Sequence, residues 1–528
     1  MRATLLTLIA LLLTMTTPAR AAWMEASSQH FVIYADQKPE ELREFSEQLE
    51  RFHHAMAYLL SVKLETPSPS NRVTVYVVRS DRDVRKLMGR SSSDVYAFYV
   101  PRAGDAFAIV PTVKTSYSTL DMPMIALLHE YAHHFLISTS SYAMPRWFSE
   151  GAAEFFASAQ FRKNGNVALG MPARHRAGEL LYGADVTAAE LIDPERYRGK
   201  PGTTPNSFYG RSWLLYHYLT FSEERAGQFG TYLRLLRSGK SLAEAGETAF
   251  GDLNALQRDL DGYLRKRRMS AFELPADRLM PSSVAIRPLS EGEAAAMPLR
   301  IRLKNRPSPE QLEVLLGELR ALAPRYPQDA TVLATLAQAE AEAGNDDAAI
   351  AAADAAIAID EHQVSAYLAK GQALFRKAET AQDTSAAYSE ARKPFLALNK
   401  LENNHPLPFQ YFYRSFVEQG LEPTKNAIAG LERAVTLAPF DQNLRTTLVM
   451  QQLHDGRYDE AIINLGPLAF DPHGRGSATW AQGLRDRLQS RDPNEDLDID
   501  ALLNDLDAAL AADEGAKAGE GVETRGAL

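Results

Sequence analysis

Hydrophobic and polar positions divide the chain into a first half with strand and helix patterns and a second half with helix patterns alone. In the first half, apolar and β-branched runs at 30–34 and 73–78 predict strands. Apolar residues recur with helical spacing across 39–60, and an apolar run predicts another helix over 121–138. The first half therefore combines both kinds of element.

A β-hairpin is predicted at 97–110, because two apolar runs flank the turn segment 101–105. Its second strand, 106–110, could be an edge strand that pairs with an extended peptide, or an ordinary strand of the sheet. Residues 144–160 and 205–268 have mainly helical patterns. We therefore expect an α+β fold in which a small sheet precedes a helical block.

The second half contains helical units of similar length. Residues 270–305 contain three prolines and a weak helical pattern, so we expect a linker that could hold one extended strand. Over 306–490 the chain is rich in alanine, and Pro439 to Pro472 spans 33 residues, a period close to that of Pro327 to Asp360. Such units resemble tetratricopeptide (TPR) repeats, with a non-repeating helical bundle as the alternative.

The two ends of the chain are expected to lie outside the folded domains. Residues 1–21 begin with Arg2, continue as a leucine-rich run and end in a small-x-small motif at Ala21. This pattern predicts a secretory signal and an exported protein, periplasmic or extracellular, although a retained anchor is the alternative. No later stretch has transmembrane length, so no integral membrane segment is expected after signal removal. Residues 491–528 are acidic and lack aromatic residues, which predicts a disordered tail.

Composition and charge narrow the classes of function. The chain has 528 residues, of which 45% are hydrophobic and 23% charged, and these values are typical of globular proteins. Its formal net charge of −10 argues against a nucleic-acid binder, which would have a basic face. Cysteine is absent, which excludes disulfides, thiolate metal ligands and a cysteine nucleophile.

The main chemical motif is the sequence HExxH at 129–133, within the predicted helix 121–138. His129 and His133 lie four residues apart, so their imidazoles share one helix face and can reach one metal ion. Glu130 lies beside the first histidine and can act as a base toward water. A catalytic zinc usually takes a third protein ligand, and Glu150 follows His133 after 16 intervening residues. Glu154 lies one helical turn beyond Glu150 and could orient a ligating histidine.

HExxH followed by Trp147-x-x-Glu150-Gly-x-Ala-Glu154 resembles the gluzincin metallopeptidases, and within them the bacterial peptidase MA-like domain. The resemblance covers roughly residues 23–268 and implies a zincin-like metallopeptidase domain over 22–269. It implies one Zn²⁺ per chain, a peptide or protein substrate, and the following roles. His129, His133 and Glu150 would bind the zinc, Glu130 would be the general base, and Glu154 would hold the supporting acidic position.

A peptidase also needs a donor for the carbonyl oxygen on which negative charge develops. Tyr209 is the candidate, at the head of a predicted helix where the resemblance also implies a tyrosine, and Arg211 is its rival. Tyr209 could instead be a core aromatic residue. His134 points about 100° away from His133 on a helix, so we expect it to pack or support rather than ligate. His53 and His54 have no spaced partner in the sequence and are expected at the surface or in the core.

Three functions are compatible with these features. The first is a zinc metallopeptidase whose TPR-like repeats bind a protein partner. The second is an exported TPR scaffold whose zinc domain is structural or degenerate, and the third is a zinc amidohydrolase acting on a non-peptide substrate. The intact Glu130 favours the first over the second, because a structural metal site needs no base.

Overall fold

The computed structural model describes residues 23–63, 65–87, 97–114, 117, 119–139, 144–193, 196, 206–471, 475–492, 497–499 and 501–504. The predicted signal at 1–21 and most of the predicted tail at 491–528 lie outside the described residues.

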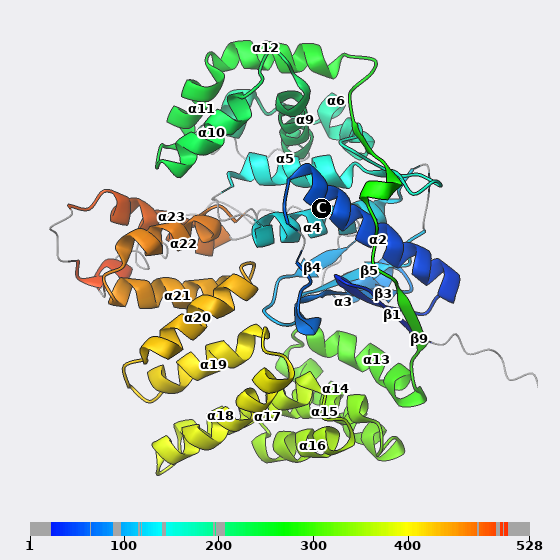
Figure 1. The fold of residues 1–528 in the computed structure, drawn as a ribbon, viewed down its shortest axis with the longest axis vertical. Coiled ribbons are helices and arrows are strands. Elements are labelled where there is room, and N and C mark those ends of the chain that lie inside the picture. Colours follow the sequence, from blue (N-terminus) through cyan, green and yellow to red (C-terminus); the bar gives the residue numbers. More distant parts are fainter. Residues whose placement is uncertain are drawn as a thin grey trace, which may run out of the picture.

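A six-stranded mixed sheet forms the centre of the first half, in the order β4-β5-β3-β2-β1-β9 (Figure 1). Strands β2, β3 and β5 run parallel, and β1, β4 and β9 run antiparallel to their neighbours. The predicted hairpin at 97–110 is confirmed as β4 and β5, but β5 lies inside the sheet. The edge strands are β4 and β9, so the second alternative for 106–110, an ordinary strand of the sheet, is the one observed. The strand bounds are β1 (Met24–Ser27), β2 (Phe31–Ala35), β3 (Val73–Val78), β4 (Phe98–Val100), β5 (Phe107–Pro111) and β9 (Ala285–Pro288).

Helices cover both faces of this sheet because its side chains alternate between two apolar clusters. Ile33 and Val75 belong to the cluster that includes residues of α2 (Pro39–Leu59) and α4 (Met122–Thr139). Tyr34 and Tyr76 belong to the opposite cluster, with residues of α3 (Asp81–Leu87) and α13 (Glu291–Lys304). The period of two along each strand thus produces a three-layered core.

A helical block follows the sheet and provides the second wall of the site described below. Its central helix α5 (Arg146–Ala157) packs against both α4 and α9 (Phe208–Phe221). A three-stranded sheet, β6-β7-β8, lies beside this block. The remaining elements are β6 (Gln160–Phe161), β7 (Val167–Leu169), β8 (Phe272–Leu274), α6 (Ala177–Tyr182), α7 (Ala188–Ile192), α10 (Gln228–Arg237), α11 (Leu242–Phe250) and α12 (Leu253–Leu264).

Residues 270–305 differ from the linker expected for them. Strand β9 pairs with β1 at the edge of the main sheet, and α13 packs Met297 and Ile301 onto its apolar face. Ser290 and Glu293 form a capping box that starts α13. An extended strand was among the expectations for this segment, and Pro288 is tolerated at the end of β9 because it lies on an edge strand. Helix α13 was not expected.

The second half consists of paired helices, as the repeat pattern predicts. Helix α15 packs against α16, α17 against α18, α19 against α20, and α21 against α22. Alanines fill the interface of α15, α16 and α17, where small side chains allow close approach. The helices are α14 (Pro309–Leu322), α15 (Ala330–Glu342), α16 (Asp346–Ile359), α17 (Val364–Glu379), α18 (Thr384–Leu401), α19 (Pro406–Val417), α20 (Lys425–Leu437), α21 (Gln442–His454), α22 (Tyr458–Ala469) and α23 (Arg475–Gln489).

The paired helices hold the turn between β4 and β5. The backbone N–H of Ala103 donates to Asp441 at 2.8 Å, and Lys304 pairs with Asp105 at 2.5 Å. Gly104, at φ +66°, lies against the ring of His405 with no room for a Cβ. The two halves of the chain therefore share an apolar cluster at this turn.

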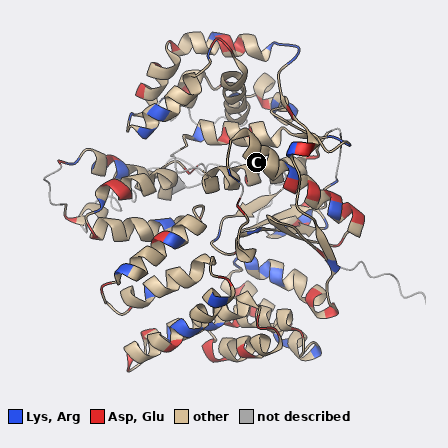
Figure 2. Cartoon of the chain, in the orientation of Figure 1, with Lys and Arg blue, Asp and Glu red and all other residues tan. Residues whose placement is uncertain are grey.

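Acidic and basic residues are interspersed along the outer helices of both halves (Figure 2). In the described part of the chain, no helix combines the length and apolar character needed to cross a bilayer.

Candidate metal centre

Two neighbouring helices bring the three predicted metal ligands together. His129 and His133 lie on one face of α4, and their Nε2 atoms are 3.1 Å apart. Glu150 lies on α5, and its Oε2 is 3.3 Å from Nε2 of His129 and 3.4 Å from Nε2 of His133. The described side chains thus place two nitrogens and one oxygen at the corners of a nearly equilateral triangle.

The size of this triangle matches one zinc ion. Zinc binds imidazole nitrogen and carboxylate oxygen at about 2.0–2.1 Å, so tetrahedrally arranged donors lie roughly 3.3–3.4 Å apart. Glu150 is fully buried, and within the described residues neither of its oxygens has a partner in hydrogen-bond geometry. A buried carboxylate facing two imidazole nitrogens is costly unless a cation compensates it. The residues present therefore fit a metal ion.

The charges of the cluster are strongly coupled. Burial alone would raise the pKa of Glu150, but interaction with His129 and His133 holds that pKa well below its usual range. Burial alone would lower the pKa of His129, but Glu150 and Glu154 raise it to about 10. In the absence of metal, His129 therefore retains a proton at neutral pH, and a metal must displace it.

Glu154 supports the outer nitrogen of His129. Its Oε1 lies 3.1 Å from Nδ1 of His129, as expected for a carboxylate that orients a ligating histidine. Arg176 donates to the same carboxylate through Nε at 2.9 Å, and His175 bonds to it at 2.5 Å. The sequence analysis missed Arg176 and His175. The sequence could indicate these two partners only indirectly. A buried carboxylate such as Glu154 needs a cationic partner, which must come from another segment of the chain.

Ser149 supports the second histidine. Its hydroxyl is hydrogen-bonded to Nδ1 of His133 at 3.1 Å. No pattern in the sequence indicated this contact, although Ser149 directly precedes Glu150 on α5. Each histidine therefore has a side chain of α5 at its outer nitrogen and Glu150 at its inner one.

Glu130, the predicted base, directly follows His129 in sequence. Glu130 is half-buried on α4. Burial and the charge of Glu130 raise the pKa of Tyr99, a residue of β4. Helix α4, which carries Glu130, packs directly against β4.

The structure separates the two candidates for the carbonyl donor. The ring of Tyr209 lies 6.5 Å from the ring of His129, and the charge of Glu150 together with burial raises the pKa of Tyr209 well above its usual value. Arg211 instead pairs with Asp185 at 2.7 Å and with Asp261 at 2.8 Å. Tyr209 thus lies beside the cluster as a protonated phenol, and Arg211 is engaged by two carboxylates of other elements.

His134 lies away from the cluster, as its helical position predicts. It is hydrogen-bonded to the hydroxyl of Tyr99 at 2.5 Å, and its ring packs against Phe440 in the turn between α20 and α21. Burial lowers the pKa of His134 to about 3, so it is neutral. It links α4 to β4 and to the second half of the chain.

Gly151 determines how closely the wall of the site is packed. A Cβ on Gly151 would collide with the backbone carbonyl of Ser212 on α9. The missing side chain therefore allows α9, which carries Tyr209, to approach α5, which carries Glu150.

Comparisons with known proteins do not assign this site. No protein-family model matches the chain, and no curated protein matches it. A thermophilic TPR protein of Thermus thermophilus is 19% identical, with 37% of this chain and 98% of that chain covered and a TM-score of 0.30. Yeast Tom70 is 12% identical, with 70% and 87% covered and a TM-score of 0.25. Neither likeness is close enough to carry an argument about function.

Proposed function

We propose that the protein is a zinc-dependent metallopeptidase. The observation that carries the proposal is the triangle of His129 Nε2, His133 Nε2 and Glu150 Oε2, with sides of 3.1–3.4 Å. Two imidazoles and one carboxylate are a ligand set of catalytic zinc sites, which keep a further position open for water or substrate. Glu130 adds the base that a purely structural site does not need.

The residues around the triangle suit the hydrolysis of an amide bond. When bound, zinc would lower the pKa of water and polarise the scissile carbonyl group. Glu130 takes a proton from the attacking water and passes it to the leaving amine nitrogen. Tyr209 donates a hydrogen bond to the carbonyl oxygen as negative charge develops there. Its ring lies 6.5 Å from the ring of His129, beside the proposed ligands.

The position of β4 supports an extended peptide as substrate. This strand forms one edge of the main sheet and packs against α4, which carries Glu130. Edge strands can pair with an added peptide strand through main-chain hydrogen bonds. We propose that β4 holds the peptide beside the catalytic residues.

A glutamine at position 130 tests the catalytic proposal. Zinc content and turnover of a broad peptide library would be measured for the wild type and for Glu130→Gln. We expect the variant to retain its zinc and lose turnover, because the substitution removes only the base. Turnover at the wild-type rate would show that Glu130 is not the base.

A helical scaffold that binds a protein partner is the second candidate function. The observation in its favour is the series of paired helices α15 to α22, because stacked helix pairs offer extended surfaces for proteins or peptides. This role requires neither Glu130 nor turnover, and it could coexist with catalysis. A protein partner that binds wild type and Glu130→Gln equally, without turnover of any peptide by the wild type, would favour the scaffold over the peptidase.

A further inference from the structure

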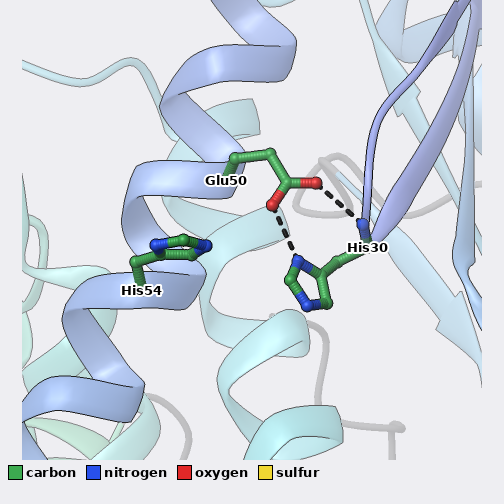
Figure 3. Close-up of side chains that lie close together, drawn as sticks. All are labelled: His30, Glu50 and His54. Atoms are coloured by element: carbon green, nitrogen blue, oxygen red, sulfur yellow. Dashed lines mark hydrogen bonds and ion pairs between the residues drawn. The ribbon is translucent and has the colours of Figure 1, made fainter. Parts of the chain in front are cut away.

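A second cluster of metal-binding side chains lies where α2 packs against the turn before β2. His30 directly precedes β2, and Glu50 and His54 lie four residues apart on α2. Residues with this spacing share one helix face, so Glu50 and His54 both point toward the turn that carries His30. Figure 3 shows the three side chains converging, with one ring nitrogen of His54 facing Glu50 and His30. Their potential ligand atoms all lie within 4.8 Å of one another.

Glu50 is fixed in place by His30. Its Oε1 accepts the backbone N–H of His30 at 2.8 Å, and its Oε2 accepts the ring Nδ1–H at 2.7 Å. Glu50 is fully buried and His30 is 5% exposed.

Two ring nitrogens of the cluster have no hydrogen-bond partner among the described residues, although His30 and Glu50 are bonded to each other. Nε2 of His30 and Nε2 of His54 are both buried, and neither has a hydrogen-bond partner among the described residues. Buried polar atoms normally have a partner, so two such atoms in one cluster need an explanation. A metal ion would provide one, because an unprotonated imidazole nitrogen is a metal ligand.

We propose that His30, Glu50 and His54 form a second zinc site, distinct from the cluster on α4 and α5. Two imidazoles and one carboxylate suit zinc rather than calcium or magnesium, which prefer oxygen ligands. The donor atoms lie within 4.8 Å of one another, more widely spread than those around His129. On binding, Oε2 of Glu50 would therefore leave Nδ1 of His30 and turn to the ion. His54 is half-buried and gives the ion a route from solvent.

The second cluster contacts α4 through His53 and Tyr131. The ring of His30 stacks on His53 with ring centroids 3.7 Å apart, and Nδ1 of His53 is hydrogen-bonded to the hydroxyl of Tyr131 at 2.6 Å. Tyr131 lies on α4 between His129 and His133 in sequence. Zinc bound by His30, Glu50 and His54 would therefore fix the turn before β2 to α2 and hold the helix that carries the HExxH motif.

Zinc stoichiometry tests this site on the purified full chain. Zn²⁺ alone would be titrated into metal-free protein in competition with a chromophoric chelator. We expect two ions for the wild type, one for His54→Gln, and two for the matched control His53→Gln, which changes the neighbouring histidine outside the donor set. Retention of one ion by His54→Gln would also show that this variant remains folded.

A second set of variants separates the two proposals. We expect Glu150→Ala to bind one ion and Glu150→Ala/His54→Gln to bind none. If Glu150→Ala bound as much zinc as the wild type while His54→Gln still lost one ion, the peptidase proposal would fail and the second site would stand. Equal stoichiometry in the wild type and His54→Gln would overturn the second site, and so would the loss of both ions from His54→Gln.

Discussion

Oε1 of Glu154 lies 3.1 Å from Nδ1 of His129, on the opposite side of the imidazole ring from Glu150. One turn of α5 therefore supplies both a carboxylate that faces the metal and a carboxylate that holds one of its histidine ligands. The HExxH helix and α5 act as a single unit, and the site depends on how they pack.

Removing the charge of Glu154 should weaken zinc binding. We expect Glu154→Gln to lower zinc affinity by about 10–100-fold, because the histidine loses the carboxylate that orients it. Chelator competition at neutral pH measures the change. Glu179→Gln is the matched control, since Glu179 also pairs with Arg176 but accepts the backbone N–H of Gly210 instead of holding a histidine ligand. An equal loss of affinity in both variants would contradict a specific role for Glu154.

A side chain at position 151 should push α5 away from α9, because no room exists between them for a Cβ. We expect Gly151→Ala to lower the free energy of unfolding by about 1–3 kcal/mol, because the new methyl group meets the backbone of Ser212. Gly262→Ala is the control, because Gly262 is exposed on α12 with nothing within 4 Å. That change should stabilise the helix by up to about 1 kcal/mol. Urea unfolding of both variants tests the difference, and equal stabilities would argue against close packing at Gly151.

Loss of the Tyr209 hydroxyl should affect turnover and not metal binding. We expect Tyr209→Phe to lower kcat by about 10²–10³-fold, the usual effect of removing one donor to the carbonyl oxygen. Arg211→Gln should instead lower the melting temperature, because it breaks the pairs with Asp185 and Asp261, and leave kcat unchanged. The reverse pattern of kcat values would assign the donor role to Arg211.

Acid should destabilise the fold through buried neutral histidines. Burial lowers the pKa of His217 to about 4, although the carbonyls of Gly170 and Ser270 act in the opposite direction. An unfolded histidine takes up its proton near pH 6.5, so stability falls as the pH drops from about 6.5 to 4.

A glutamine at position 217 should reduce that pH dependence. We expect His217→Gln to lower the slope of unfolding free energy by up to about 1.4 kcal/mol per pH unit over this range. Urea midpoints at several pH values measure the slope. His362→Gln is the control, because His362 is 73% exposed, and it should keep the wild-type slope. A wild-type slope in His217→Gln would show that His217 does not contribute.

The local part of the site could be predicted from sequence, because helix geometry fixes it. His129 and His133 share a face through their spacing alone. The partners from more distant segments could not be predicted, since Arg176, His175 and His30 reach their clusters only through tertiary packing. For the same reason the sequence offers no ligand from another segment to pair with His54, although Glu50 lies one helical turn before it.

The fold shows the same limit. Apolar and β-branched runs correctly indicated β2 and β3, helical spacing indicated α2, and an apolar run indicated α4. The order of strands was not predictable, so the sequence left open whether 106–110 is an edge strand or an interior one. One extended strand was expected within 270–305, but its pairing with β1 depends on tertiary packing and no local pattern indicated it.

Diffraction at the zinc absorption edge tests the central claim most directly. Crystals of the full chain grown with Zn²⁺ would give an anomalous difference map that locates each ion. We predict a peak about 2.0–2.2 Å from Nε2 of His129, Nε2 of His133 and a carboxylate oxygen of Glu150. A map with no peak among these three side chains would contradict the account.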